Sequence, residues 1–425
     1  MTGRDQESRS IEIWAKVLKR LDDEVPNEVY SVKLEPLIFL GTSGSVARFE
    51  FPLSQGDWHA WVKNTFGKRI SQLWREEDDS ISELEIVPQE QSSLTAAQIE
   101  ELEQQRRAAA TKLEQSWVAA VQKARERGRI ETQIDAEPIR KQLGKIGVWS
   151  RTPYFGPAET ATEWATVAEE LGDSASWIPG FAGGHIFERC AMPLAATSNL
   201  TIGTSIVNIW RHPPAECAEE TKKLQADSSG RFLLGLGASH KGLVGDDYDK
   251  ISPLAKMRGY LEELAAEGLP GEDCVLGAFG PKMLELGAKR TTGGHPYLVT
   301  AEYTAAARVM LGEGPLLAPE VAVILESDPD KARAIAREFI TLYLRGPNYA
   351  NNMYRLGYTV EDFTAEGGDI SDRLIDALVP WGDPETIAAK VRAHLDAGAD
   401  HVGVQSWGPK PEVDVWRELA PVLLD

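Results

Sequence analysis

The chain has 425 residues, of which 42% are hydrophobic and 26% are charged. A chain of this length is expected to form at least two folding units, each with its own core. It contains no run of eighteen apolar residues and its amino terminus is charged, which predicts a soluble, cytoplasmic protein without a membrane span. The formal net charge of −20 opposes direct binding to nucleic acid or to anionic membranes.

The three cysteines, Cys190, Cys217 and Cys274, are widely spaced. This spacing fits neither a disulfide framework nor the paired ligands of a zinc site, so buried thiols and no metal site are predicted. Because the overall charge is acidic, any anionic ligand is expected to be held by local donor groups.

Residues 1 to 91 have the pattern of a small α+β domain. Apolar residues from Ile11 to Leu21 recur at helical spacing, and Pro26 ends that segment. Two extended runs, LIFLG and VARFEF, are joined by a Gly-Thr-Ser-Gly turn, which predicts a hairpin. A helix from about Gln55 to Trp74 and a last strand, LEIV, complete the predicted order.

Residues 92 to 145 are dominated by Glu, Gln, Arg and Ala, and Pro138 is their only proline. The segment SLTAAQIEEL carries a helix-start signal. Apolar residues then recur close to the helical period, namely Ile99, Leu102, Ala109, Leu113, Trp117 and Val121. Two interpretations stay open, a solvated helical linker and a coiled-coil association helix.

Eight short β runs, each followed by a helical stretch, fill residues 146 to 425. The runs are GVWS, ASWI, LTIGTSIVNIW, RFLLGLGA, DCVLGAF, HPYLV, EVAVILES and HVGVQSW. This alternation predicts an α/β fold in which parallel strands close into a (β/α)8 TIM barrel. A doubly wound open sheet is the alternative, but no G-x-G-x-x-G follows the first run.

The barrel segment carries the motifs LGKIGVWS, LTIGTSIVNIWRHP, GRFLLGLGASH, GPKMLELGAKR, HPYLVT, PNYANNMYRLGY and LDAGADHVGVQ. With these motifs it resembles the luciferase-like monooxygenase superfamily, and within it the F420-dependent oxidoreductases. The resemblance implies an enzyme that transfers a hydride between the deazaflavin coenzyme F420 and a small organic substrate, and a homodimer formed through the barrel. FMN is the alternative cofactor, because flavin-dependent members share the fold.

The resemblance also assigns residues to the coenzyme, at the carboxyl ends of the strands where barrels build their active sites. Ser205 and Ile206 match a bulge with a non-prolyl cis peptide that supports the deazaflavin ring. A bulge with trans geometry is the alternative. The other positions implied to lie against the coenzyme are Trp177, Asn208, Arg211, Gly237, Ser239 and His240.

Phe279, Gly280 and Lys282 match the phosphate site of the family, at the end of the fifth strand. The start of a helix offers free N–H groups and a partial positive charge, and Gly280 lets a ligand approach the backbone. Lys282 could add a full charge. An ordinary Gly-Pro helix start is the alternative.

Hydride transfer requires little of the protein beyond placing the substrate against the ring, and at most one proton donor is expected beside it. His240 is the first candidate for that donor, and His295, Tyr297 and His185 follow it. Sugar-phosphate-oxidising relatives use an Asp-His pair at the end of the second strand, where this chain has Trp177 and Ile178. That mechanism therefore does not carry over.

Residues 10 to 87 are similar to the amino-terminal domain of the bacterial replication initiator DnaA, on the segments IWAKVLKRLDDEVPNEVYSVKLEPL and FEFPLSQGDWHAWVKNTFGKRISQL. This similarity implies a KH-like domain for self-association or for docking to a replication protein. Trp14, or Trp58 and Trp61, would provide the contact surface, with a place in the core as the alternative.

Two functions of different classes follow, an F420-dependent oxidoreductase with an accessory interaction domain and a replication-associated binding protein whose barrel is inert. The strand-end motifs favour the enzyme, because an inert scaffold would not need Gly280 or the Ser205 segment. Residues 1 to 91 are then expected to be dispensable for hydride transfer, and a chain that begins near Gln142 is expected to bind the coenzyme.

Overall fold

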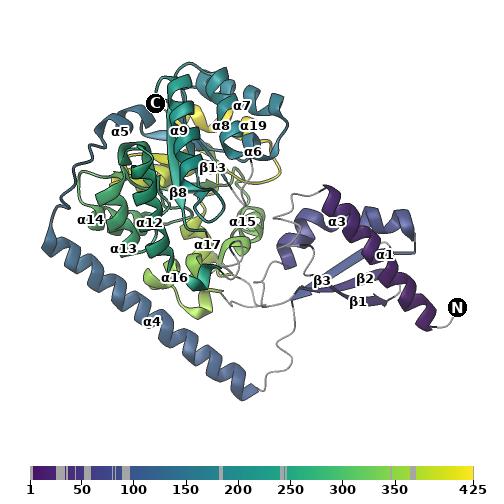
Figure 1. Cartoon of the computed structure of the whole chain (residues 1–425). Coiled ribbons are helices and arrows are strands. Elements are labelled where there is room, and N and C mark those ends of the chain that lie inside the picture. The colour runs from purple at the N-terminus through teal and green to yellow at the C-terminus, as the bar shows by residue number, and fades with distance from the viewer. Residues whose placement is uncertain are drawn as a thin grey trace. The chain divides into compact units, whose positions relative to one another are not determined.

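The computed structural model describes residues 3–24, 34, 37–43, 45–51, 59–78, 80–81, 83–88, 96–180, 185–239, 244, 247–344, 347–363 and 370–424. The chain divides into two compact units (Figure 1). The first is built mainly from residues 1–105, and the second begins at Arg106 and contains the barrel. In the described part of the chain, no helix is both long enough and apolar enough to cross a membrane.

The first unit contains a three-stranded sheet with the order β1-β2-β3. β1 (Ile38–Ser43) pairs antiparallel with β2 (Val46–Phe51), and β2 pairs parallel with β3 (Glu83–Pro88). α1 (Gly3–Glu24) and α3 (His59–Glu77) pack on each other and on this sheet. The predicted hairpin and last strand are confirmed, whereas Pro26 and residues 55–58 lie outside the described residues.

Aromatic rings fill the core of the first unit. Trp14 is only 6% exposed, and its ring centroid lies 4.6 Å from that of Phe49 and 6.3 Å from that of Trp74. Of the two interpretations of Trp14, the place in the core is confirmed, and Trp14 does not provide a contact surface. The side chains of Trp58 and Trp61 lie outside the described part of the chain.

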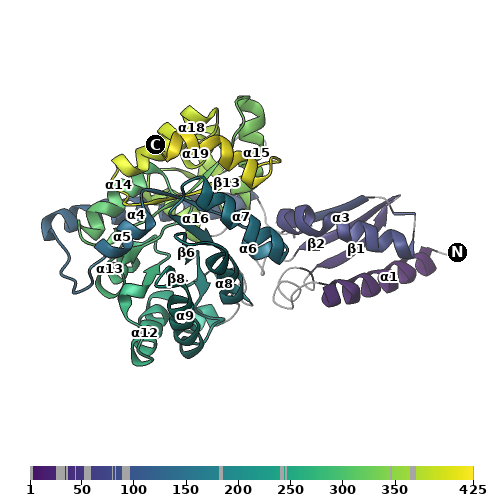
Figure 2. The ribbon, with the colours of Figure 1, turned by 90° about the horizontal axis from the view of Figure 1, so that it is seen from above.

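The second unit is an α/β fold of the TIM-barrel type with parallel strands (Figure 2). The sheet path runs β11-β10-β9-β8-β6-β5-β4-β13-β12, and Ala318 and Pro319 alone separate β11 from β12 in the chain. The first and last strands of this path, β11 and β12, are therefore consecutive in the chain, so the two edges of the sheet lie side by side and the sheet closes into a barrel. The strands are β4 (Ile146–Trp149), β5 (Ala175–Ile178), β6 (Thr201–Thr204), β7 (Val207–Asn208), β8 (Phe232–Gly237), β9 (Cys274–Leu276), β10 (Gly293–Gly294), β11 (Leu316–Leu317), β12 (Glu320–Val323) and β13 (Val402–Ser406).

The sixth strand lies earlier than the run HPYLV that was predicted for it. β10 ends at Gly294. The His295 N–H still donates to the carbonyl oxygen of Leu276 at 2.7 Å, the carbonyl oxygen of Pro296 accepts from the Glu320 N–H at 2.8 Å, and the regular pairing then ends. Pro296 has no N–H to donate, and Leu298 has a φ of 52°, so neither residue suits an extended ladder. As a consequence, His295 and Tyr297 lie beyond the carboxyl end of the strand, where barrels place their functional groups.

Helices cover the outside of the barrel, and those predicted after each strand are confirmed (Figure 2). Several begin with Pro in the first turn, where its missing N–H has no intrahelical partner to lose. The longer helices are α7 (Ala158–Glu170), α8 (Ile186–Ala196), α9 (Pro214–Ser228), α12 (Pro253–Ala266), α13 (Pro281–Arg290), α14 (Ala301–Leu311), α15 (Pro329–Leu344), α18 (Pro384–Asp396) and α19 (Glu412–Leu423). The shorter ones are α5 (Glu137–Leu143), α6 (Thr152–Phe155), α11 (Asp247–Lys250), α16 (Pro347–Arg355) and α17 (Asp372–Leu378), with 3-10 turns η4 (Gly271–Asp273) and η5 (Val360–Phe363).

α4 (Ala96–Arg127) is the predicted linker helix, and one of its faces is not solvated. Ala110, Trp117 and Ala124 recur every seven residues and are buried. Trp117 and Ala124 belong to the same hydrophobic cluster as the barrel helices. This face therefore packs on the barrel, and it is not free to form the coiled coil that was the alternative interpretation.

Candidate functional site

The strand ends meet in a polar network around the peptide between Ser205 and Ile206. This peptide is cis, which confirms the predicted non-prolyl cis bond. The indole N–H of Trp149 donates to Ser205 Oγ at 2.7 Å, and Ser205 Oγ lies 2.8 Å from His295 Nε2. On the other side of the ring, His295 Nδ1 lies 2.5 Å from the carbonyl oxygen of Ala318.

These contacts fix the tautomer of His295. A carbonyl oxygen can only accept, so Nδ1 carries the proton and Nε2 accepts from the Ser205 hydroxyl. Burial lowers the pKa of His295 to about 4, which keeps the ring neutral near pH 7. Because the ring is buried and both nitrogens are bonded, the geometry favours a positioning role for His295 over the proton donor that was predicted.

The Ile206 side chain occupies space that two glycines leave open. A Cβ added at Gly237 would lie 2.3 Å from Ile206 Cδ1, and one added at Gly277 would lie 3.3 Å from Ile206 Cγ2. Gly237, a predicted site residue, is thus required by close packing against the Ile206 side chain. Two residues further on, the carbonyl oxygen of Ser239 accepts a hydrogen bond from Asn348 Nδ2 at 3.3 Å.

Trp177 lies inside the barrel and does not reach the surface. Its ring stacks on that of His295, with centroids 4.0 Å apart and an interplanar angle of 13°. Its indole N–H donates to Nε2 of His401 at 2.9 Å. The structure corrects the expectation that Trp177 touches the coenzyme, because its side chain is fully buried and supports His295 instead.

Asn208 ends β7, and Arg211 lies in the turn that follows. Asn208 is buried, and its Oδ1 accepts a hydrogen bond from the backbone N–H of Trp210 at 3.0 Å. Among the described residues, Asn208 Nδ2 has no hydrogen-bond partner. A buried donor of this kind is unusual and marks a place where a ligand could be bound. Arg211 is exposed.

The predicted phosphate position lies at the start of α13. Gly280 is the N-cap residue and Pro281 the first helical residue. A Cβ added at Gly280 would come within 4 Å of one described group, Nη2 of Arg355 at 3.7 Å. The space before the helix is therefore open to a ligand and is flanked by a guanidinium group. Lys282 is exposed in the first turn.

Arg355, the last residue of α16, was not singled out in the sequence. Within the described part of the chain, its guanidinium forms neither a hydrogen bond nor an ion pair, and burial lowers its pKa. An arginine nonetheless stays charged at neutral pH, so an unpaired and half-buried one points to a bound anion. Arg355 is the one cationic residue of the motif PNYANNMYRLGY, and that signal could have identified it.

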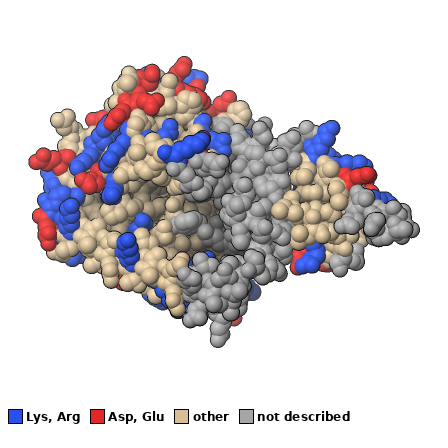
Figure 3. All heavy atoms as spheres, turned by 60° about the horizontal axis from the view of Figure 1, so that its bottom comes forward, with Lys and Arg blue, Asp and Glu red and all other residues tan. Residues whose placement is uncertain are grey.

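Local groups are the relevant source of attraction for an anion. On the face drawn in Figure 3, basic and acidic side chains are interspersed over the barrel. With a net charge of −20, the whole chain does not attract anions over a long range. Arg355 and the start of α13 therefore have to supply the binding free energy at close contact.

A line of aromatic rings connects the two ends of the site. The Tyr297 ring lies 5.6 Å from Trp149 and 6.2 Å from Tyr349, and the Tyr349 ring lies 5.4 Å from Phe279, measured between centroids. Trp149 is bonded to Ser205, and Phe279 precedes Gly280. Aromatic side chains thus lead from the Ser205 network toward Gly280 and Arg355, an arrangement suited to a flat heteroaromatic ligand with an anionic tail.

Tyr297 is the best placed of the predicted proton donors. Its half-buried side chain lies beyond a strand end, and its hydroxyl donates to Gln405 Oε1 at 2.8 Å. His240 lies outside the described residues. His185 is exposed, 2.9 Å from the carboxylate of Glu188 on α8.

A buried carboxyl group lies in the same region. Glu320 Oε2 accepts a hydrogen bond from the backbone N–H of Leu298 at 2.9 Å, and no described group bonds its Oε1. Burial raises the pKa of Glu320 to about 8, so the group is mainly protonated at neutral pH. A glutamate at the start of the apolar run EVAVILES is the signal that could have identified it.

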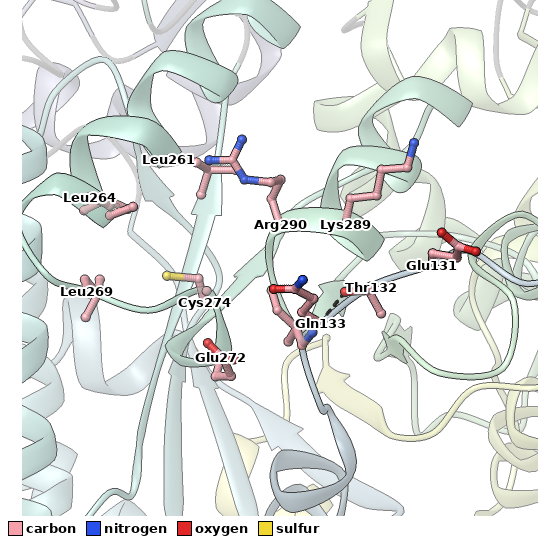
Figure 4. A pocket seen from close by; sticks show the side chains of 13 residues that line it. Glu131, Thr132, Gln133, Leu261, Leu264, Leu269, Glu272, Cys274, Lys289 and Arg290 are labelled. Atoms are coloured by element: carbon pink, nitrogen blue, oxygen red, sulfur yellow. Dashed lines mark hydrogen bonds between the residues drawn. The ribbon is translucent and has the colours of Figure 1, made fainter.

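A cavity of about 650 Å³ lies elsewhere (Figure 4). Its lining includes residues 131–134, Cys274 at the start of β9 and Arg290 at the end of α13. In a βα barrel the starts of strands lie at the face opposite the active site, so this cavity is separate from the network above. Among the described residues, no group of three His, Cys, Asp or Glu side chains is arranged to hold a metal ion.

Known proteins resemble the second unit. Relatives include a 5,10-methylenetetrahydromethanopterin reductase of Methanolobus tindarius, 23% identical over 60% of this chain and 93% of the relative. A putative coenzyme F420-dependent oxidoreductase of Mycobacterium tuberculosis is 24% identical over 60% of this chain and 91% of the relative.

Two solved structures share the fold at low identity. An F420-dependent secondary alcohol dehydrogenase with an F420–acetone adduct is 16% identical, with a TM-score of 0.52 over 66% of this chain and 99% of its own. The F420-dependent tetrahydromethanopterin reductase of Methanopyrus kandleri is 18% identical, with a TM-score of 0.52 over 65% and 99%. The sequence model of the luciferase-like monooxygenases matches residues 142–267 and 266–401. The chain therefore belongs to the luciferase-like monooxygenase family, a family of oxidoreductases.

Proposed function

We propose that this chain is an F420-dependent oxidoreductase that transfers a hydride between coenzyme F420 and a small organic substrate. One observation carries the proposal: Arg355, which no described residue pairs, flanks the start of α13, and aromatic rings lead from there to Ser205. The relatives named as F420-dependent support the choice of this coenzyme.

The described residues fit such a coenzyme. Arg355, Lys282 and the free N–H groups at the start of α13 would hold its phosphate. Ser205 and Ile206, held in place by His295, would support the ring. The coenzyme supplies a ring carbon that gives or takes the hydride.

The chain's own residues would bind the coenzyme, orient the substrate and supply a proton to it. Tyr297, whose hydroxyl donates to Gln405, is the candidate for holding or donating a proton at a polar atom of the substrate. Asn208 could bind the edge of the ring through its Nδ2, which no described residue bonds.

FMN is the second candidate cofactor, because it also combines a flat ring with a phosphate. A titration of the full chain with F420 and with FMN, followed by absorbance and fluorescence, separates the two. We expect F420 to bind with a micromolar or smaller dissociation constant. The Gly280→Val variant should not bind it, since a branched side chain would fill the space before α13. Binding of FMN without F420 would reject the coenzyme assignment.

For residues 1–91 we infer a role in protein association, as the similarity to the DnaA amino-terminal domain implies. The supporting observation is an apolar surface on the edge strand β1, where Ile38 is 45% and Leu40 47% exposed. The partner would be a second copy or a replication protein, and the barrel would form a homodimer of its own. Sedimentation of the full chain and of an Ile38→Asp, Leu40→Asp variant tests this role. Equal association states for the two proteins would argue against it.

A further inference from the structure

We propose that the linker helix α4 is part of the coenzyme site and that Trp117 positions the phosphate loop, residues 278 to 280. This inference rests on the proposed function. It also revises the expectation that a chain beginning near Gln142 binds the coenzyme, because such a chain lacks Trp117.

The first link joins α4 to α14. Trp117 is 4% exposed, and its ring stacks on that of Tyr303 with centroids 5.5 Å apart and an interplanar angle of 18°. Tyr303 is itself fully buried. Since the two rings cover each other, removing the indole would open a cavity beside the phenol ring and allow it to shift.

The second link joins α14 to the phosphate loop. The Tyr303 hydroxyl lies 3.1 Å from the carbonyl oxygen of Ala278 and 2.9 Å from that of Phe279, and these two acceptors share its single proton. These carbonyls belong to the peptides directly before Gly280. Fixing them also fixes the direction of the N–H groups that would face a phosphate.

Two further contacts join α4 to neighbouring elements. Arg127 Nη2 donates to the carbonyl oxygen of Met310 on α14 at 2.6 Å, and Arg107 Nε lies 3.1 Å from a carboxylate oxygen of Glu361. Glu361 is in η5, which follows α16 and its last residue, Arg355. α4 thus reaches the elements that carry Tyr303 and those next to Arg355, along the outside of the barrel (Figure 1).

α4 lies before the part of the chain that matches the family. The family match begins at residue 142, after the end of α4. The helix is therefore an addition to the family barrel that supports a loop within it. Trp117 is a positioning residue, because it acts on the phosphate loop through Tyr303 and does not touch the coenzyme.

The test compares F420 with a deazaflavin that lacks the phosphate, titrated into Trp117→Ala, Trp117→Phe and, as a control, Val118→Ala. Val118 is an exposed neighbour on the same helix. We expect Trp117→Ala to weaken F420 binding about tenfold, the range of a misplaced charge-assisted hydrogen bond, and to leave the phosphate-free ligand unaffected. Trp117→Phe should restore most of the affinity, and Val118→Ala should match the wild type.

A second variant covers the case in which Trp117→Ala does not fold. Tyr303→Phe keeps the ring stack and removes the hydroxyl, so it should show the same selective loss of F420. Equal losses for both ligands, or none, in the two variants would overturn the inference while the proposed function stands. A wild-type protein that binds neither deazaflavin would overturn the proposed function itself and the inference with it.

Discussion

Ser205 Oγ lies 2.8 Å from Nε2 of His295, a residue ninety positions away in the chain. His295 donates through Nδ1 to the carbonyl oxygen of Ala318, so its Nε2 can only accept. The Ser205 hydroxyl therefore donates its proton to Nε2 of His295. The side chain next to the cis peptide is thus held by a buried, neutral ring. A rigid Ser205 side chain would help to keep the proposed coenzyme ring in place.

The His295→Phe variant tests this role. Phenylalanine keeps a ring to stack on Trp177 but leaves the Ser205 hydroxyl without its acceptor and the Ala318 carbonyl without its donor. We expect a loss of about 1 to 3 kcal/mol in the free energy of unfolding, measured with urea. The control is His185→Phe at an exposed position, for which a change below about 0.5 kcal/mol is expected. Equal stability of the two variants would speak against the network.

Acid should destabilise the barrel through its buried histidines. Burial lowers the pKa of His295, His394 and His401 to about 4 each. An unfolded histidine titrates near 6.5, so between these values the unfolded chain binds more protons, and stability is lost as the pH falls. Each histidine contributes up to roughly 3 kcal/mol across this window. Melting temperatures measured from pH 7 to pH 4.5 should fall, less so for His401→Gln. A constant or rising melting temperature would contradict the neutral histidines.

Glu320 should destabilise the fold as the pH rises, whereas the buried histidines do so as the pH falls. Its folded pKa of about 8 lies above the unfolded value near 4.5, so the folded chain binds more protons between them and stability is lost as the pH rises. Glutamine accepts the same bond from Leu298 and does not ionise. Glu320→Gln should therefore match the wild type near pH 5 and exceed it in unfolding free energy at pH 8. The exposed Glu272→Gln variant should show no such gain, and the same pH dependence in all three proteins would exclude a buried acid.

Arg355 should lower the stability of the free protein and strengthen its binding of F420. Replacing it with Met removes a half-buried charge that has no described partner, which predicts a higher melting temperature for the free protein. The same change should weaken F420 binding by at least about tenfold. Lys282→Ala, at an exposed position, should weaken binding by about 1 to 3 kcal/mol without a gain in stability. If Arg355→Met binds F420 as tightly as the wild type, the anion lies elsewhere.

The periodic parts of this fold could be predicted from the sequence, because each barrel strand is an apolar run and each outer helix has an apolar face. The strand ends could not be predicted with equal precision. Pro296 and Leu298 end the sixth strand earlier than its apolar run implies. The cis peptide and the start of α13 could be identified from motifs that are local in the chain.

Long-range relations could not be identified in the same way. Trp177 was assigned to the coenzyme because it ends a strand, but its direction into the barrel depends on His295 and His401, which lie more than a hundred residues away. Arg355 and Gly280 are equally distant in sequence, and only the packing of α16 reveals that they face each other. The packing of Trp117 on Tyr303 required the same three-dimensional information.

A crystal structure of the full chain grown with F420 tests the proposed coenzyme site most directly. We expect the ring to lie against Ser205 and Ile206, and a phosphate oxygen to lie within about 3 Å of Arg355 and of a backbone N–H at the start of α13. A phosphate bound at another place, or a ring that does not contact the cis peptide, would contradict it.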